Sequence, residues 1–286
     1  MVEFLQAVAE NRFLQYALLT GLVASVACGV VGTYVVVRRI TYIAGAISHC
    51  ILGGMGAARY LQTVHGWERC TPLYGAIVAA LLAAVIIGLV SMRAKQREDT
   101  VIGAIWSIGM ATGVLFIART PGYNTDLMSY LFGNVLMVSL NDLWLIVGLD
   151  ALVVTVGVLF YKQFLAVCFD EEFARLRGIR VDLYYMGLLC LTALTVVVLV
   201  KVVGLILVIA LLTLPVAVAG HFSRTLWQMM ILSTIVSAGI TTAGLAVSYG
   251  PDLPAGATTI VLAGFVYLVV VIAVRGHHWP SRVWRR

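Results

Sequence analysis

Residues 169–180 read FDEEFARLRGIR and interrupt the apolar sequence more sharply than any other long interior segment. The chain has 286 residues, of which 62% are hydrophobic and only 11% are charged, and its mean hydropathy is +1.01. This composition is typical of membrane proteins, so a segment so dense in charge has to lie in water between two membrane spans. The sequence therefore predicts an all-α polytopic membrane protein.

The charged segment itself has the features of a short amphipathic helix. Phe169, Phe173 and Leu176 recur at helical spacing, and Gly178 supplies a stop. Acidic residues precede basic ones, in the order that the helix dipole favours. Such a helix can dock into a groove on a soluble partner, and the alternative interpretation is an ordinary solvated loop.

Nine apolar runs are long enough to cross a bilayer, which takes about 20 residues. We expect the spans at 13–37, 44–61, 73–92, 101–118, 143–161, 183–200, 205–219, 226–248 and 258–274. A shorter apolar run, 126–138, is expected to be re-entrant or interfacial. Residues 1–274 would then form a single transmembrane domain and residues 275–286 a basic tail, and no cleaved signal peptide is expected.

The distribution of positive charge predicts the orientation. With the N-terminus outside, fourteen of the 19 Lys and Arg residues fall on one side, which the positive-inside rule makes the cytoplasm. The five on the opposite side are Arg12, Arg59, Arg69, Arg119 and Lys201. Residues 169–180 and the C-terminal tail are thus expected in the cytoplasm. Because the net charge of +6 follows this pattern rather than one face, no nucleic-acid partner is expected.

Several common enzymatic patterns are missing from the sequence. It contains no GxxxxGK[ST] motif, so the chain is not expected to bind ATP through a Walker loop. It has no HExxH motif, clustered Ser/His/Asp set or paired carboxylates, which argues against a membrane enzyme. The five cysteines form no CxxC pair and predict no disulfide framework.

Four segments in order resemble the permease subunits of ABC-type zinc, manganese and iron importers, the metal-ion ABC-3 family. They are GAISH at 45–49 with Gly53-Gly54, DLMSYLFG at 126–133, Asp170-x3-Ala174-x3-Gly178, and 203–217 with LLTLP at 211–215. The resemblance runs from about Leu14 to Val274. It implies an importer subunit in a bacterial or archaeal cell (inner) membrane, with a divalent transition metal as substrate and no permanently bound cofactor. Which of zinc, manganese and iron it carries stays open.

The resemblance also implies protein partners. These are cytoplasmic ABC ATPase subunits that use the ATP, a second permease subunit that is either the same chain or a sister, and an extracellular metal-binding protein. Asp170, Phe173, Ala174 and Gly178 correspond to the coupling helix, about 169–180, which enters the ATPase in that family. Two other transporter classes remain open: a permease for a metal chelate, which would not need His49, and an ATP-independent secondary transporter.

His49 is the first candidate for the metal path. An imidazole within an apolar span is costly unless it faces a cavity or a partner, and it is a good ligand for transition metals. The alternative is a histidine hydrogen-bonded to a neighbouring helix. Members of the family often carry an aspartate four residues earlier, where this chain has Gly45. Asp150 either replaces that carboxylate or bonds a polar group across a helix interface.

Other polar residues are weaker candidates. Asp126 is expected to cap the short helix that follows it, to gate the entrance, or both. His65, Glu68 and Cys70 form either a weak external cation site or part of a solvated loop. His277 and His278 belong to the basic tail, as a metal sensor or as unstructured chain.

Overall fold

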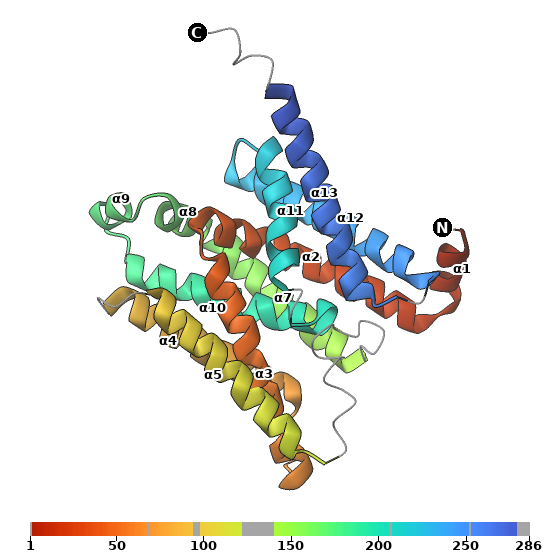
Figure 1. Ribbon diagram of the computed structural model, residues 1–286. Coiled ribbons are helices and arrows are strands. Elements are labelled where there is room, and N and C mark those ends of the chain that lie inside the picture. The colour runs from red at the N-terminus through yellow and green to blue at the C-terminus, as the bar shows by residue number, and fades with distance from the viewer. Residues whose placement is uncertain are drawn as a thin grey trace.

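The computed structural model describes residues 2–67, 69–93, 98–121, 140–205, 208–251 and 253–278. Throughout these ranges the regular structure is helical and no strand occurs (Figure 1). The helices are α1 (Val2–Glu10), α2 (Arg12–Arg38), α3 (Thr41–Val64), α4 (Pro72–Arg93), α5 (Glu98–Arg119), α7 (Leu140–Leu159), α8 (Tyr161–Phe169), α9 (Glu171–Leu176), α10 (Val181–Val203), α11 (Val208–Phe222), α12 (Leu226–Tyr249) and α13 (Ala255–His278).

Each of the nine predicted spans coincides with a helix, but not all nine helices have the length and composition of a span. Six do, namely α2, α4, α5, α10, α12 and α13, and α7 with α8, bent by 71°, makes a seventh if the pair is one span. The helix α3, which carries Ser48, His49 and Arg59, and the 15-residue α11 are not among them. The count of nine and the orientation therefore stay predictions. The run 126–138 lies outside the described residues.

The helix ends follow from local sequence. Asn11 accepts a hydrogen bond from the Phe13 amide at 3.2 Å and so caps α2, which separates it from α1. Arg39 ends α2 in the left-handed conformation, with φ of 63°. Pro72 is the first residue of α4, where its missing amide proton costs nothing. Thr225 caps α12 by accepting from the Gln228 amide at 3.3 Å.

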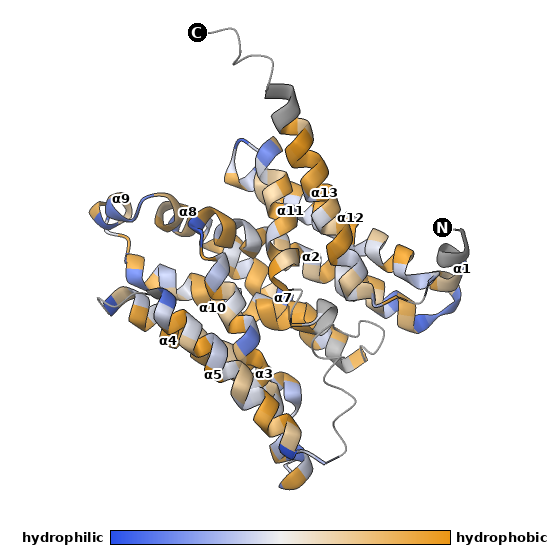
Figure 2. Cartoon of the chain, in the orientation of Figure 1, coloured by the Kyte–Doolittle hydropathy of each residue, from blue (hydrophilic) through white to orange (hydrophobic). Residues whose placement is uncertain are grey.

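The helices pack in two groups that share α10. In the first group α3 packs extensively against α4 and α5, and in the second α2 packs against α7, α11 and α12, with α13 outermost. The helix α10 contacts α3 and α4 on one side and α2 and α7 on the other (Figure 1). Figure 2 shows hydrophobic residues along the helix middles and hydrophilic ones gathered at helix ends and at α9. This is the arrangement expected for a bundle surrounded by lipid.

The central helix is α2. Its apolar stretch is 72% buried, whereas that of α13 is 11% buried. Polar side chains inside the bundle bond back to their own helices: Ser25 donates to the Gly21 carbonyl at 2.7 Å, and Thr33 donates to the Gly29 carbonyl at 2.6 Å. These bonds satisfy hydroxyls where no water is available. Polar residues are therefore tolerated in the core of α2.

Glycines bring the backbone of α3 directly against α4 and α5. A Cβ added to Gly53 would lie 2.8 Å from the Gly109 carbonyl oxygen, and one added to Gly56 would lie 2.9 Å from the Gly113 carbonyl oxygen. Gly54 faces Gly75 of α4 with no space for a side chain on either residue. Small residues allow this approach in membrane proteins, where packing rather than water exclusion joins helices.

We predict that Gly109→Ala destabilises the fold and Gly103→Ala does not, although both residues lie on α5. The new methyl at residue 109 would stand 2.6 Å from the Cα of Cys50, whereas no atom lies within 4 Å of the methyl added at residue 103. Overpacking of this kind costs about 1–3 kcal/mol. The thermal unfolding midpoint of each purified variant in detergent measures the difference, and equal midpoints would contradict the close α3–α5 contact.

Candidate functional site

His49 lies in α3 with its ring stacked on an indole of α5. The ring centroids of His49 and Trp106 are 4.4 Å apart and the planes differ by 17°. Trp106 also contacts Tyr42, two turns earlier on α3, with centroids 5.9 Å apart. Both His49 and Trp106 are half-buried, and no hydrogen bond joins either His49 ring nitrogen to another residue in the described part of the chain. Stacking on Trp106 covers one face of the imidazole and leaves both ring nitrogens without a partner among the described residues.

The space beside Gly45 is already filled. A Cβ added to Gly45 would lie 2.8 Å from Cδ1 of Ile209 and 3.3 Å from Cζ3 of Trp106. Ile209 belongs to α11, which otherwise touches α3 only sparsely. The residue four before His49 is thus a glycine where three helices meet, and the aspartate that the resemblance leads one to expect there would have no room without rearrangement.

Asp150 lies in α7 and faces α2. Its side chain is buried, and its Oδ1 accepts a hydrogen bond from the Ala27 amide at 3.2 Å. This is the interhelical contact that the sequence left as one of two alternatives. Among the described residues no three His, Cys, Asp or Glu side chains gather where they could hold a metal ion. The structure does not bring Asp150 and His49 into such a group, and Asp126 lies outside the described residues.

The weaker candidates are dispersed. His65 is exposed just beyond the end of α3, edge-on to Tyr60 with centroids 5.7 Å apart. Cys70 is half-buried, and Glu68 lies outside the described residues. The helix α13 continues through His277 to His278, beyond the predicted end of the span.

The charged segment 169–180 contains a short helix with defined ends. Asp170 accepts a hydrogen bond from the Phe173 amide at 2.9 Å and caps α9. Gly178 follows the helix with φ of +76°, a conformation that favours glycine. Ala174 is fully buried and seats α9 on the bundle. A helix therefore lies within the predicted range, and Gly178 follows it as the stop that the sequence indicated, while the cap at Asp170 is a further feature that the structure shows.

The large apolar side chains around α9 point away from the protein's own core. Phe169 is 67% exposed, Phe173 is 50% exposed and Leu176 is 88% exposed. Figure 1 shows α9 at the margin of the bundle, beyond α8. An apolar cluster in a segment otherwise rich in charge is a surface suited to binding another protein.

Comparison with known proteins decides the family. The family described as ABC 3 transport family matches residues 10–274. The chain belongs to the ABC 3 transport family. It is 42% identical over 264 residues to the "Probable metal transport system membrane protein" of Chlamydia pneumoniae, covering 92% of this chain and 89% of that protein. It is 33% identical over 267 residues to the manganese import system permease protein ScaB of Streptococcus gordonii, covering 93% of each.

A solved structure of similar fold also exists. The structure described as PsaBC from Streptococcus pneumoniae in complex with Fab superposes with a TM-score of 0.84 at 32% sequence identity. The match covers 94% of each chain. The whole helical bundle of this ABC 3 family chain therefore has a counterpart in a protein of known structure.

In this ABC 3 family chain two ion pairs connect α9 to neighbouring helices. Arg38, at the end of α2, pairs with Glu171, and its guanidinium lies 5.5 Å from the centre of the Tyr185 ring of α10. Arg175 of α9 bonds Asp182 of α10 at 3.0 Å. Ion pairs as accessible to solvent as these contribute little stability. They connect α9 to the central helix α2 and to α10, the helix that the two packing groups share.

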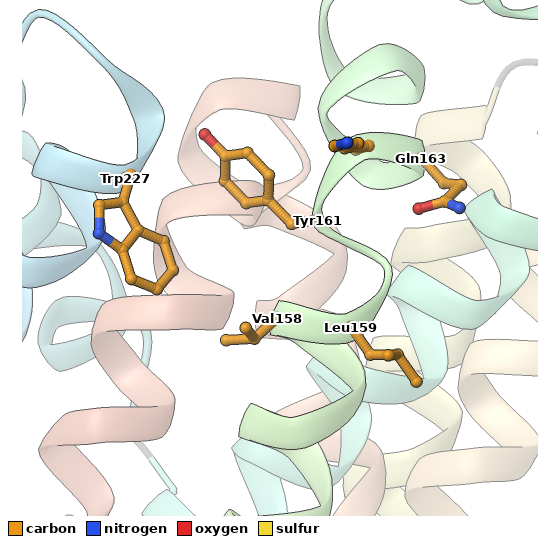
Figure 3. Close-up of a pocket in the computed structure, with 6 residues that line it drawn as sticks. Val158, Leu159, Tyr161, Gln163 and Trp227 are labelled. Atoms are coloured by element: carbon orange, nitrogen blue, oxygen red, sulfur yellow. The ribbon is translucent and has the colours of Figure 1, made fainter.

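An open groove lies at the bend between α7 and α8 (Figure 3). It has a volume of about 510 Å³ and is lined by Val158, Leu159, Tyr161, Lys162, Gln163 and Trp227. The rings of Tyr161 and Trp227 stand nearly perpendicular across it, 6.0 Å apart. Aromatic rings beside a lysine are typical of the membrane–water interface. None of the described residues that line the groove carries a carboxylate, thiol or imidazole for a metal ion.

Sequence reasoning missed Trp106, Arg38 and Glu171. Each makes its contact with a helix distant in the sequence, and no spacing within one helix predicts such a contact. For Trp106, the sequence offered one indication. It is a large aromatic residue in a predicted span, and the neighbouring predicted span is rich in glycine. For Arg38 and Glu171, the indication was that the two residues carry opposite charges and lie in segments that are both predicted to be cytoplasmic.

We predict that Asp150→Asn leaves both folding and metal uptake nearly unchanged. The amide oxygen of asparagine still accepts a hydrogen bond from the Ala27 amide, whereas the charge that a metal ligand would need is lost. The unfolding midpoint in detergent and the initial rate of uptake into proteoliposomes measure the two properties, and we expect uptake within about twofold of the wild type. A well-folded variant that has lost uptake would instead place Asp150 in the metal path.

Proposed function

We propose that the chain is the membrane-spanning permease subunit of an ATP-binding cassette importer for divalent transition metal ions. His49 lines the metal path in this proposal. The observation that carries it is an imidazole within an apolar helix, held by stacking on Trp106 while its nitrogens bond to no described residue. Imidazole suits zinc, manganese and iron to differing degrees, and the relative from Streptococcus gordonii is named as a manganese import permease.

The proposal includes the topology and the partners. Nine spans with the N-terminus outside place α9 in the cytoplasm, within a single transmembrane domain, residues 1–274, in a bacterial or archaeal inner membrane. ATP is used by separate ATPase subunits, since the sequence has no Walker motif. A second permease subunit and an extracellular metal-binding protein complete the importer. Asp126 stands near the outer opening of the path, and the basic tail from residue 275 lies in the cytoplasm.

The contacts of α9 suggest how ATP-driven motion reaches His49. The exposed Phe173 and Leu176 bind the ATPase, while Glu171 and Arg175 connect α9 to α2 and α10. The helix α10 is the element that both packing groups share, so a push at α9 acts where the groups meet. His49 lies near another meeting point, since Gly45 contacts Ile209 of the second group. Rocking of the groups would then alternately open and close the path at His49.

We predict that His49→Ala lowers metal uptake at least about tenfold, which is the scale on which changes around metal ligands act. The measurement is the initial rate of zinc, manganese and iron uptake into proteoliposomes that contain the permease, its ATPase and its binding protein. His221→Ala is the matched control, because His221 is an exposed histidine in the last turn of α11. Undiminished uptake of all three ions by the His49 variant would remove this residue from the path.

We also predict that Leu176→Asp weakens ATPase binding at least about tenfold, whereas Leu176→Met does not. Aspartate would place a charge in an apolar contact, while methionine keeps the volume and polarity of the side chain. The fraction of ATPase bound to permease in nanodiscs, titrated with purified ATPase, measures the effect. Equal binding by both variants would show that the ATPase docks elsewhere.

A further inference from the structure

The groove at the bend between α7 and α8 lies between helices that share a neighbour but hardly touch each other. The helices α7, α8 and α12 all pack against α2, whereas the described parts of α7 and α8 have at most marginal contact with α12. The 71° bend turns α8 away from the line of α7. Tyr161 and Trp227 stand on either side of the resulting space of about 510 Å³, which is open to molecules of the surrounding membrane (Figure 3).

The groove changes from apolar to basic along its length. The apolar stretch of α7 precedes the bend and that of α12 follows Trp227, so the bilayer centre lies on the side of Val158 and Ile231. Both of these side chains are exposed, and Ile231 continues the face of Trp227 one turn further along α12. Lys162 follows the bend and is exposed, and the aromatic pair of Tyr161 and Trp227 stands at the same end of the groove. A phospholipid presents its acyl chains and its phosphate in the same order.

The charge of the groove favours an anionic headgroup. Lys162 forms no ion pair with any described residue, and none of the described residues that line the groove is acidic. Three residues before Trp227, the exposed Arg224 lines a second groove at the start of α12, and it too has no ion pair among the described residues. Paired aromatic rings can also attract a quaternary ammonium, but the lysine beside them repels a positively charged group.

We propose that this groove binds an anionic phospholipid, with the phosphate at Lys162 and one acyl chain against Trp227 and Ile231. The exposed face of α12 that would support this chain runs from Trp227 through Ile231 to Ile235, a length of about 12 Å at the helical rise. This site involves none of the residues assigned to the metal path or to ATPase binding, so it goes beyond the proposed transport function. A lipid bound here connects the bend of α7 and α8 to α12, where the protein itself makes little contact.

Native mass spectrometry of the full chain in detergent, titrated with phosphatidylglycerol or with phosphatidylcholine of the same acyl chains, tests the proposal. We expect phosphatidylglycerol to bind at least about fivefold more tightly, which is the scale of one lysine acting on an anionic lipid surface. Lys162→Gln should remove this preference and leave phosphatidylcholine binding unchanged, because it removes only the charge. Arg93→Gln is the matched control and should keep the preference, since Arg93 is an exposed arginine at the end of α4, outside the groove.

Two further measurements identify the occupant. Trp227→Ala should weaken the binding of both lipids, because the indole contacts the acyl chain rather than the phosphate. Millimolar inorganic phosphate should not displace phosphatidylglycerol, since it has no acyl chain to bury. Equal affinities of the wild type for the two lipids, or the same loss in the Lys162 and Arg93 variants, would overturn the inference. Displacement by phosphate would also overturn it in favour of a soluble anion, and lipid bound to monomers but not to dimers would assign the groove to a contact between two copies.

Discussion

Direct contact between the backbones of α3, α4 and α5 determines where the candidate metal residue lies. Gly53 and Gly56 face carbonyl oxygens of α5 at distances that no larger residue permits, and Gly54 faces Gly75 of α4 in the same way. Because α3 is fixed this closely, His49 has to meet whatever α5 presents at the same level, which is the indole of Trp106. Lipid supplies no hydrophobic force between helices, so this small-residue packing is what holds the three-helix group together.

The second group depends on α2, whose polar side chains bond within their own helix or to neighbouring helices. Ser233 of α12 donates to the Gly29 carbonyl of α2 at 3.1 Å, and Asp150 of α7 accepts from the Ala27 amide. These bonds join α2 to two neighbours through groups that would otherwise be unsatisfied in a bilayer. The two groups therefore cohere differently. The first is joined by close backbone packing and by aromatic contacts between α3 and α5, and the second also by polar bonds between helices.

The sequence predicted the helices better than their membrane crossing. Each of the nine apolar runs contains a helix, as expected where apolar segments in lipid have to satisfy their backbones internally. The hydropathy of α3 is lowered by Ser48, His49 and Arg59, so composition alone does not establish it as a span. Within 169–180 the short helix and its stop at Gly178 were readable, since both depend on residues only a few positions apart. The His49–Trp106 stack was not, because it depends on how α3 and α5 align.

His49 lies on the part of α3 where the first group of helices approaches the second. Within its own group α3 packs extensively against α4 and α5, whereas toward the second group it touches α11 and α2 only sparsely, with Gly45 close to Ile209 of α11. Motion between the groups therefore costs fewer contacts near His49 than motion within either group. The connection to α9 lies on the shared helix, through Arg175 and Asp182, and on the central helix, through Arg38 and Glu171. The helix α9 is therefore connected directly to α2 and α10, whereas the contact of α3 with α11 on the turn before His49 is sparse beside the packing of α3 on α4 and α5.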